Sequence, residues 1–178
     1  PPPPPRSSSP RYATCSRTNK SVRRHSSMLY LIGQAACGKS TLGAALAACT
    51  GRPWVDLDAE IERRAGMSVR QIFDTLGEEE FRRIEADTLA LVAARADSPI
   101  VACGGGTPCR DASMRLMLAT GTVVWLRADP ARVISRILDA PGQRPRYDHV
   151  RDLAEALRRE LDDRTPAYAR AHHTFDST

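Results

Sequence analysis

Residues 33–41 read Gly-Gln-Ala-Ala-Cys-Gly-Lys-Ser-Thr and fit the pattern G-x-x-x-x-G-K-[ST] of a phosphate-binding loop. The apolar run Met28–Ile32 before it is typical of a strand, and apolar residues spaced for one helix face follow it. Strand, loop and helix in this order let backbone N–H groups and a helix N-terminus face an anion. We therefore expect polyphosphate binding, with Lys39 on the phosphates and the Ser40 hydroxyl on Mg²⁺. A glycine-rich turn that matches by chance is the alternative.

The charge of the chain is unevenly distributed. Its 178 residues carry a formal net charge of +5, yet residues 1–27 hold six Arg and Lys and no Asp or Glu. Residues 28–178 hold 20 basic and 21 acidic residues, so this part is near neutral, which disfavours nucleic-acid binding by the domain. The length suits one domain with its own core. An apolar run long enough for a transmembrane helix is absent from the sequence, so we expect no membrane association.

The basic N-terminal segment, residues 1–27, is rich in Pro and Ser and almost free of apolar residues. Such a segment cannot bury enough surface to offset its ordering entropy, so we expect it to be disordered and the domain to span residues 28–178. Three interpretations compete: sequence upstream of a true start at Met28, which we favour, an organelle-targeting segment, and an arm that binds nucleic acid or a partner.

The cysteines indicate a reducing compartment. Five are scattered along the chain without a C-x-x-C pair: Cys15, Cys37, Cys49, Cys103 and Cys109. An odd, scattered set is typical of free thiols, so we expect a cytoplasmic protein without a cysteine metal site.

Two carboxylates follow the second apolar stretch. Residues Pro53–Asp58 predict a short strand, and because residues i and i+2 of a strand point the same way, Asp56 and Asp58 should project together from its end. Beside a phosphate-binding loop, one carboxylate can hold Mg²⁺ and the other can orient an attacking hydroxyl or accept its proton. The alternative is an Asp-rich helix start, which carboxylates also favour.

Arginines stand in the first turns of a helix predicted from Glu78 to about Ala96, after a short helix that opens at a Ser68–Gln71 capping box. Cations there oppose the helix dipole, so Arg82 and Arg83 either bind an anion or pair with neighbouring glutamates.

Glycines and further arginines occur at other predicted element ends. The apolar strand Pro99–Cys103 runs into three glycines, residues 104–106, which either let a ligand approach the backbone or form a tight turn. Residues 139–149 lack periodicity and carry Arg144 and Arg146, so they form either a mobile basic lid over phosphates or a solvated linker. A polar helix is predicted from 150 to 163, and residues 164–168 should begin a separate last helix.

Strands alternate with helices along the chain. Strands are expected at Met28–Ile32, Pro53–Asp58, Pro99–Cys103, Thr122–Leu126 and His172–Phe175. The alternation predicts an α/β fold of three layers, α/β/α, around a five-stranded parallel sheet. Ligands bind beyond the carboxyl ends of such strands, so the phosphate-binding loop, the carboxylate pair and the glycine turn should converge on one crevice.

From about Met28 to Thr178 the sequence resembles shikimate kinases, in the nucleoside-monophosphate-kinase-like branch of the P-loop kinase fold. The resemblance rests on the phosphate-binding loop and, in order, on Asp56-Leu57-Asp58 with Ile61-Glu62, Gly77-Glu78 with Phe81-Arg82 and Glu85, Gly104-Gly105-Gly106, Arg144-Pro145, and Arg164-Thr165-Pro166-Ala167-Tyr168. It implies ATP-dependent phosphorylation of the 3-hydroxyl of shikimate in aromatic amino-acid biosynthesis, with ATP and shikimate as partners. We expect a monomer.

The resemblance also implies residue roles. Catalytic roles fall on Lys39 at the phosphates, Asp58 at the acceptor hydroxyl and Arg144 as the lid arginine that stabilises transferring charge. The implied ATP site comprises Ala36, Cys37, Gly38, Lys39, Ser40, Thr41 and Arg144, with Mg²⁺ on Ser40 and Asp56. The implied substrate site comprises Asp58, Arg82, Gly104, Gly105, Gly106 and Arg164. A looser match places Arg136 near the adenine.

Departures from the family pattern occur in the loop and the lid. Ala36 stands where the family usually has Gly, and a positive φ there would strain the loop. Cys37 places a thiol beside a helix N-terminus and Lys39, so we expect thiol reagents to inactivate the protein. After Arg144-Pro145, the polar residues 146–148 replace the usual apolar ones.

Two other functions are open. A related sugar-acid kinase of the gluconate type would share the loop, but Arg82 and Arg164 together favour a ring carboxylate. A non-catalytic domain that senses nucleotide or ligand is compatible with Ala36, whereas retention of Asp58 argues against it.

Overall fold

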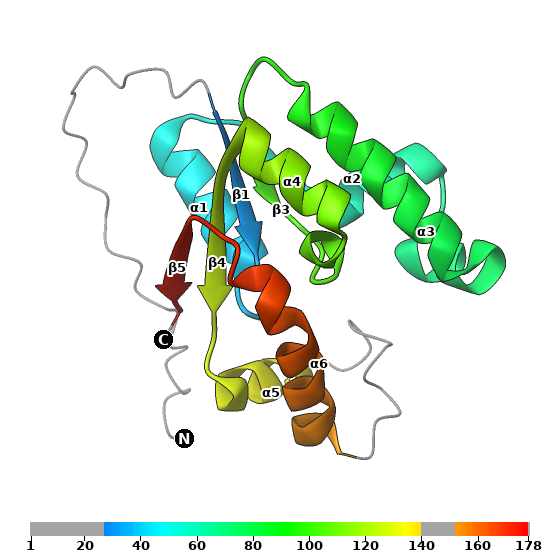
Figure 1. The fold of residues 1–178 in the computed structure, drawn as a ribbon, viewed down its shortest axis with the longest axis vertical. Coiled ribbons are helices and arrows are strands. Elements are labelled where there is room, and N and C mark those ends of the chain that lie inside the picture. Colours follow the sequence, from blue (N-terminus) through cyan, green and yellow to red (C-terminus); the bar gives the residue numbers. More distant parts are fainter. Residues whose placement is uncertain (1–26, 140–151, 178) are drawn as a thin grey trace, which may run out of the picture.

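Five parallel strands form the centre of the fold, in the order β2-β3-β1-β4-β5 (Figure 1). The computed structural model describes residues 27–139 and 152–177. The strands are β1 (Met28–Ile32), β2 (Trp54–Asp56), β3 (Ile100–Ala102), β4 (Gly121–Arg127) and β5 (His173–Asp176). The helices are α1 (Lys39–Thr50), α2 (Leu57–Ala65), α3 (Val69–Ala93), α4 (Asp111–Thr120), α5 (Pro130–Leu138) and α6 (Leu153–Tyr168), with a 3-10 turn η1 (Thr107–Cys109). The predicted α/β fold with a five-stranded parallel sheet is confirmed.

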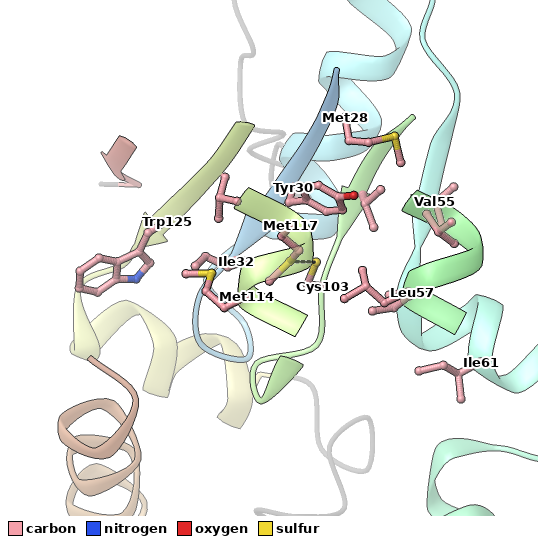
Figure 2. Packing of buried hydrophobic residues seen from close by; sticks show 14 of the residues in the cluster. Met28, Tyr30, Ile32, Val55, Leu57, Ile61, Cys103, Met114, Met117 and Trp125 are labelled. Atoms are coloured by element: carbon pink, nitrogen blue, oxygen red, sulfur yellow. Dashed lines mark hydrogen bonds between the residues drawn. The ribbon is translucent and has the colours of Figure 1, made fainter. Parts of the chain in front are cut away.

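Both faces of the sheet are covered by apolar side chains. Along β1, Met28, Tyr30 and Ile32 join a core cluster with residues of α2, α3 and α4, parts of which Figure 2 shows. Leu29 and Leu31 belong to a second cluster with residues of α1, α5 and α6. A parallel sheet that is buried on both faces requires apolar residues at successive positions, as β1 and β4 have. The helices of the two clusters form the outer layers, with the sheet as the layer between them.

The carboxyl ends of the strands lead into the segments that carry the predicted site. β1 runs into the phosphate-binding loop, β2 into α2, and β3 into the glycine turn. α5 and α6 lie beyond the carboxyl end of β4 (Figure 1). The strand pairing aligns Ile32 of β1 with Trp125 of β4 and Asp56 of β2 with Ala102 of β3, which sets these ends side by side.

The second strand is shorter than expected, and its predicted carboxylate geometry is wrong. β2 ends at Asp56, and Asp58 belongs to the first turn of α2. Asp56 is the N-cap of that helix, with its side chain accepting from the backbone N–H groups of Asp58 and Ala59. The alternative of an Asp-rich helix start is therefore the observed local structure, because the Asp56 carboxylate satisfies N–H groups that the first turn of a helix leaves unpaired.

The long helices follow the predictions in part. The Ser68–Gln71 capping box is present, and Gly77 interrupts α3 with φ 83°. The break expected near Asp163 is wrong, since α6 continues through Pro166 to Tyr168. Pro166 sits in the last turn, where its missing N–H removes one backbone bond, and the turn still buries Tyr168.

Two predicted segments fall outside the described residues. Residues 1–26 include almost all of the basic segment, and residues 140–151 include Arg144, Arg146 and most of the predicted lid. Among the helices that the structure describes, none is long and apolar enough to cross a membrane.

Candidate active site

The phosphate-binding loop joins β1 to α1, and donors from other segments bind its carbonyl groups. Lys39 Nζ donates to the carbonyls of Gly33 at 2.9 Å and Gln34 at 2.6 Å. Arg136 Nη1 donates to the Ala36 carbonyl at 2.9 Å, and Ser177 Oγ donates to the Cys37 carbonyl at 3.1 Å. The first N–H groups of α1 have no acceptor within the helix, so they provide the anion-binding end of the loop.

Two residues of the loop determine its backbone strain and the reactivity of its thiol. Ala36 has φ 59°, the left-handed conformation in which a Cβ is costly, as the departure from Gly suggested. Cys37 is only 1% exposed, packed near Gly33, and its thiol is therefore shielded from reagents in this conformation. The expected inactivation by thiol reagents loses its basis, because reactive cysteines are at least partly exposed.

A hydroxyl and a carboxylate meet at the start of α1. Ser40 Oγ donates to Asp56 Oδ2 at 3.0 Å, while Asp56 Oδ1 accepts from Asp58 N–H at 3.1 Å. The helix cap thus orients one carboxylate oxygen and leaves the other beside the loop. Oxygen donors of this kind suit Mg²⁺, which usually takes one or two protein ligands and keeps several waters. The described residues, this pair included, contain no group of three or more His, Cys, Asp or Glu that could hold a metal by themselves.

The pKa of Asp58 is unusually high for an aspartate. Desolvation by the surrounding protein, and then the negative charges of Asp56 and Glu85, raise the pKa of Asp58 from its ordinary 3.8 to about 6. Its Oδ1 lies 3.1 Å from the position that a Cβ on Gly104 would occupy. The carboxylate therefore faces the glycine turn, and a carboxylate with a raised pKa is better matched to proton transfer near neutral pH.

The three glycines of the turn each contact a different functional side chain. A Cβ on Gly105 would lie 2.7 Å from Arg164 Nη1 and 3.5 Å from the Gly33 carbonyl oxygen of the phosphate-binding loop. A Cβ on Gly106 would lie 2.7 Å from both terminal nitrogens of Arg82. Glycine is required here because the two guanidinium groups pack directly on the backbone. The turn brings together Asp58, Arg82, Arg164 and the loop.

Ion pairs orient the arginine from α3. Arg82 Nη1 donates to Glu85 Oε2 at 2.9 Å and its Nη2 donates to Glu78 Oε1 at 3.2 Å. The Glu85 side chain is 1% exposed, and its second oxygen accepts from the Thr107 hydroxyl at 2.6 Å. Arg83 pairs with exposed carboxylates instead. Pairing explains Arg83, whereas Arg82 is paired and also faces the glycine turn.

The arginine from α6 is held in a comparable way. Arg164 Nη1 lies 2.5 Å from Glu160 Oε1, and its side chain is 13% exposed. Neither Glu160 nor Thr107 was identified from the sequence as part of the site. The four-residue spacing of Glu160 and Arg164 on a helix is the signal that could have found the first.

A family model described as "Shikimate kinase" matches residues 35–178, most of the chain. The chain belongs to the shikimate kinase family. A shikimate kinase from Synechococcus sp. is 43% identical over 143 residues, which cover 80% of this chain and 74% of the relative. A crystal structure of shikimate kinase from Bacteroides thetaiotaomicron superposes with a TM-score of 0.81 at 33% identity, covering 85% of this chain and 86% of that one.

A second solved relative carries a ligand. The shikimate kinase from Acinetobacter baumannii in complex with shikimate has a TM-score of 0.79 and 30% identity, covering 85% of this chain and 84% of that one. The resemblance inferred from the motifs is thereby confirmed at the level of family, fold and kinase activity. Arg144, the predicted lid arginine, lies within the family match but outside the described residues.

Proposed function

We propose that the chain transfers the γ-phosphoryl group of ATP to the 3-hydroxyl of shikimate, giving ADP and shikimate 3-phosphate. One observation carries the proposal: the carboxylate of Asp58 and the guanidinium groups of Arg82 and Arg164 meet at the glycine turn, beside the Gly33 carbonyl of the phosphate-binding loop. A small polyhydroxy acid needs cations for its carboxylate and a carboxylate for its reacting hydroxyl, and this crevice offers both.

The substrate carboxylate would bind between the two arginines. Each guanidinium has five N–H donors, so the contacts of Arg82 with Glu78 and Glu85 leave further donors for a ligand. Planar guanidinium groups bind carboxylates through paired hydrogen bonds. Gly104, Gly105 and Gly106 would then lie against the ring, since they have no side chains to obstruct it.

The nucleotide would bind at the loop. The backbone of residues 36–41 would hold the phosphates, and Lys39 would exchange its contacts with the Gly33 and Gln34 carbonyls for phosphate oxygens. Ser40 and Asp56 would hold Mg²⁺, which neutralises phosphate charge when bound. Arg144 remains the proposed lid cation. Arg136 contacts the loop carbonyl of Ala36, which is compatible with a place near the nucleotide.

Asp58 would orient the 3-hydroxyl and accept its proton. With its pKa raised to about 6, the side chain is mostly ionised at neutral pH and is a stronger base than an ordinary aspartate. Asp58 approaches Gly104 while Arg164 and Arg82 approach Gly105 and Gly106, which supports a ring whose carboxylate binds the arginines while a hydroxyl faces Asp58.

A coupled ADP-release assay on the full chain tests the proposal, with shikimate, quinate and gluconate as acceptors and Mg·ATP as donor. We expect turnover with shikimate, and weak or no turnover with gluconate. Preference for gluconate would instead indicate a sugar-acid kinase. Absence of turnover with any acceptor, together with retained ATP binding, would favour a sensing domain and overturn the proposal.

A further inference from the structure

One face of α6 carries three polar side chains at four-residue intervals: Glu160, Arg164 and Tyr168. Glu160 is buried and pairs with Arg164 at 2.5 Å. The Tyr168 hydroxyl oxygen and Arg164 Nη1 both face Gly105, at 3.6 Å and 2.7 Å from the position that a Cβ on that glycine would occupy. The same hydroxyl donates to the Gly105 carbonyl at 2.7 Å. A chain of contacts therefore runs from the helix through the guanidinium to the glycine turn.

The aromatic ring of Tyr168 is fixed independently of this chain. The residue is fully buried, and its ring lies 5.6 Å from the ring of Trp125 on β4 at an interplanar angle of 45°. Burial raises the pKa of the Tyr168 hydroxyl, so it remains a protonated donor at neutral pH. Because the ring packs against the sheet and the hydroxyl donates to Gly105, the Tyr168 oxygen holds a fixed position beside the Arg164 guanidinium.

Arginine side chains have several rotatable bonds, and an ion pair alone does not fix the plane of the guanidinium. Glu160 pairs with Arg164 Nη1 from one turn earlier on the same helix. The Tyr168 hydroxyl lies at the glycine turn, 3.6 Å from the hypothetical Cβ of Gly105 that Nη1 approaches to 2.7 Å. The ion pair and the hydroxyl beside the turn together restrict where the guanidinium can lie.

We propose that Tyr168 is a positioning residue that fixes Arg164 against Gly105 and thereby sets where the substrate carboxylate binds. This inference rests on the proposed function, in which Arg164 binds that carboxylate. Tyr168 itself does not touch the reacting atoms. By fixing Arg164, its hydroxyl would contribute to substrate recognition. It would favour acids whose carboxylate can reach Arg164 while the reacting hydroxyl faces Asp58.

The test is Tyr168→Phe, which keeps the ring and its contact with Trp125 and removes only the hydroxyl. Tyr30→Phe is the matched control, since Tyr30 is also fully buried and its hydroxyl bonds to Thr120 at 2.8 Å, away from the glycine turn. Arg164→Gln tests the proposed function separately. Kinetics are measured with shikimate, with shikimate methyl ester and with varied ATP, and urea unfolding is followed for each variant.

For Tyr168→Phe we expect KM for shikimate to rise about tenfold, the scale on which the loss of one hydrogen bond, here to the Gly105 carbonyl, weakens binding. KM for ATP and kcat should stay within about twofold of the wild type, as for an interaction that contributes to binding alone. The preference for shikimate over its methyl ester should narrow. Tyr30→Phe should change none of these constants.

Each other result is decisive. Unchanged shikimate kinetics in Tyr168→Phe, with a raised KM in Arg164→Gln, would overturn the inference and leave the proposed function standing. Normal kinetics in both variants would remove Arg164 from the proposed site and the inference with it. Equal increases in KM for ATP and shikimate, or failure of Tyr168→Phe to fold, would assign the hydroxyl a purely structural role and also overturn the inference.

Discussion

Replacing Asp58 by Asn should reduce activity and at the same time stabilise the protein. Asp58 faces Gly104 in the crevice, and desolvation together with the charges of Asp56 and Glu85 raises its pKa to about 6. The same surroundings that favour a base disfavour its negative charge in the folded state. An amide of equal shape carries no charge at any pH, so Asp58→Asn separates the chemical role from the electrostatic cost.

The size of the stabilisation follows from the pKa. A rise from 3.8 to about 6 corresponds to about 3 kcal/mol if fully expressed. The residue is exposed and lies in the first turn of α2, so solvent screening and the helix N-terminus reduce the expected gain to about 1 kcal/mol. Because the folded protein holds this proton more tightly than the unfolded chain, the wild type loses stability as pH rises from about 4 to 6. The gain of the variant should be complete above about pH 6 and absent below about pH 4.

Urea unfolding of wild type and variant between about pH 4 and pH 8 measures this difference. The coupled ADP-release assay should show kcat reduced by about 10² to 10⁴, the contribution typical of a general base, with ATP binding largely intact. In the wild type, kcat/KM should fall about tenfold per pH unit below pH 6 as Asp58 is protonated. Asp74→Asn, which changes an exposed carboxylate 3.6 Å from Arg70, is the control and should alter neither quantity.

A variant that is less stable than the wild type at about pH 8 would refute the electrostatic reasoning. So would a stability difference that is the same at both ends of the pH range. Near-normal turnover would remove Asp58 from the mechanism.

Three further substitutions test the packing of the loop and the core. Ala36→Gly should stabilise the protein by up to about 1 kcal/mol in urea unfolding, since it removes a left-handed Ala at the cost of some backbone entropy; a loss of stability would contradict the strain. Gly43→Ala should destabilise the protein by about 1–3 kcal/mol and raise KM for ATP, because its Cβ would lie 1.9 Å from the Trp54 ring and displace α1. Combining it with Trp54→Leu should restore part of the lost stability. Strict additivity of the two stability changes would count against the clash. Thr88→Val should raise the free energy of unfolding in urea by about 1 kcal/mol, since the buried Thr88 hydroxyl has no hydrogen-bond partner among the described residues; a lower free energy of unfolding would indicate that the hydroxyl is bonded.

Local patterns were enough to predict most of the fold. The loop between an apolar strand and a helix and the Ser68–Gln71 capping box both formed as expected, because each depends on neighbours in sequence. Asp56 and Asp58 were assigned to the site with the wrong local structure. A strand end and a helix cap share the same pattern, and the point at which β2 ends decides between them.

The supporting residues of the site could not be derived from local patterns. Thr107 reaches Glu85 across 22 positions, and Tyr168 reaches Gly105 across 63. These contacts exist only after β3 and α6 are in place. Burial of Cys37 is similar, since nothing in the loop sequence indicates that the thiol turns into the core cluster shared by β1, β4 and α5.

The conformation of the phosphate-binding loop depends on segments that lie far from it in sequence. A left-handed Ala costs about 1–2 kcal/mol, which the loop alone would relieve by changing φ. Arg136 from α5 donates to the carbonyl of Ala36, and Ser177 after β5 donates to the carbonyl of Cys37, the next residue. Two hydrogen bonds of about 1 kcal/mol each are enough to offset the strain. The proposed ATP site is therefore completed by residues that fold onto it from the second half of the chain, and Ala is tolerated at position 36 because those contacts hold it.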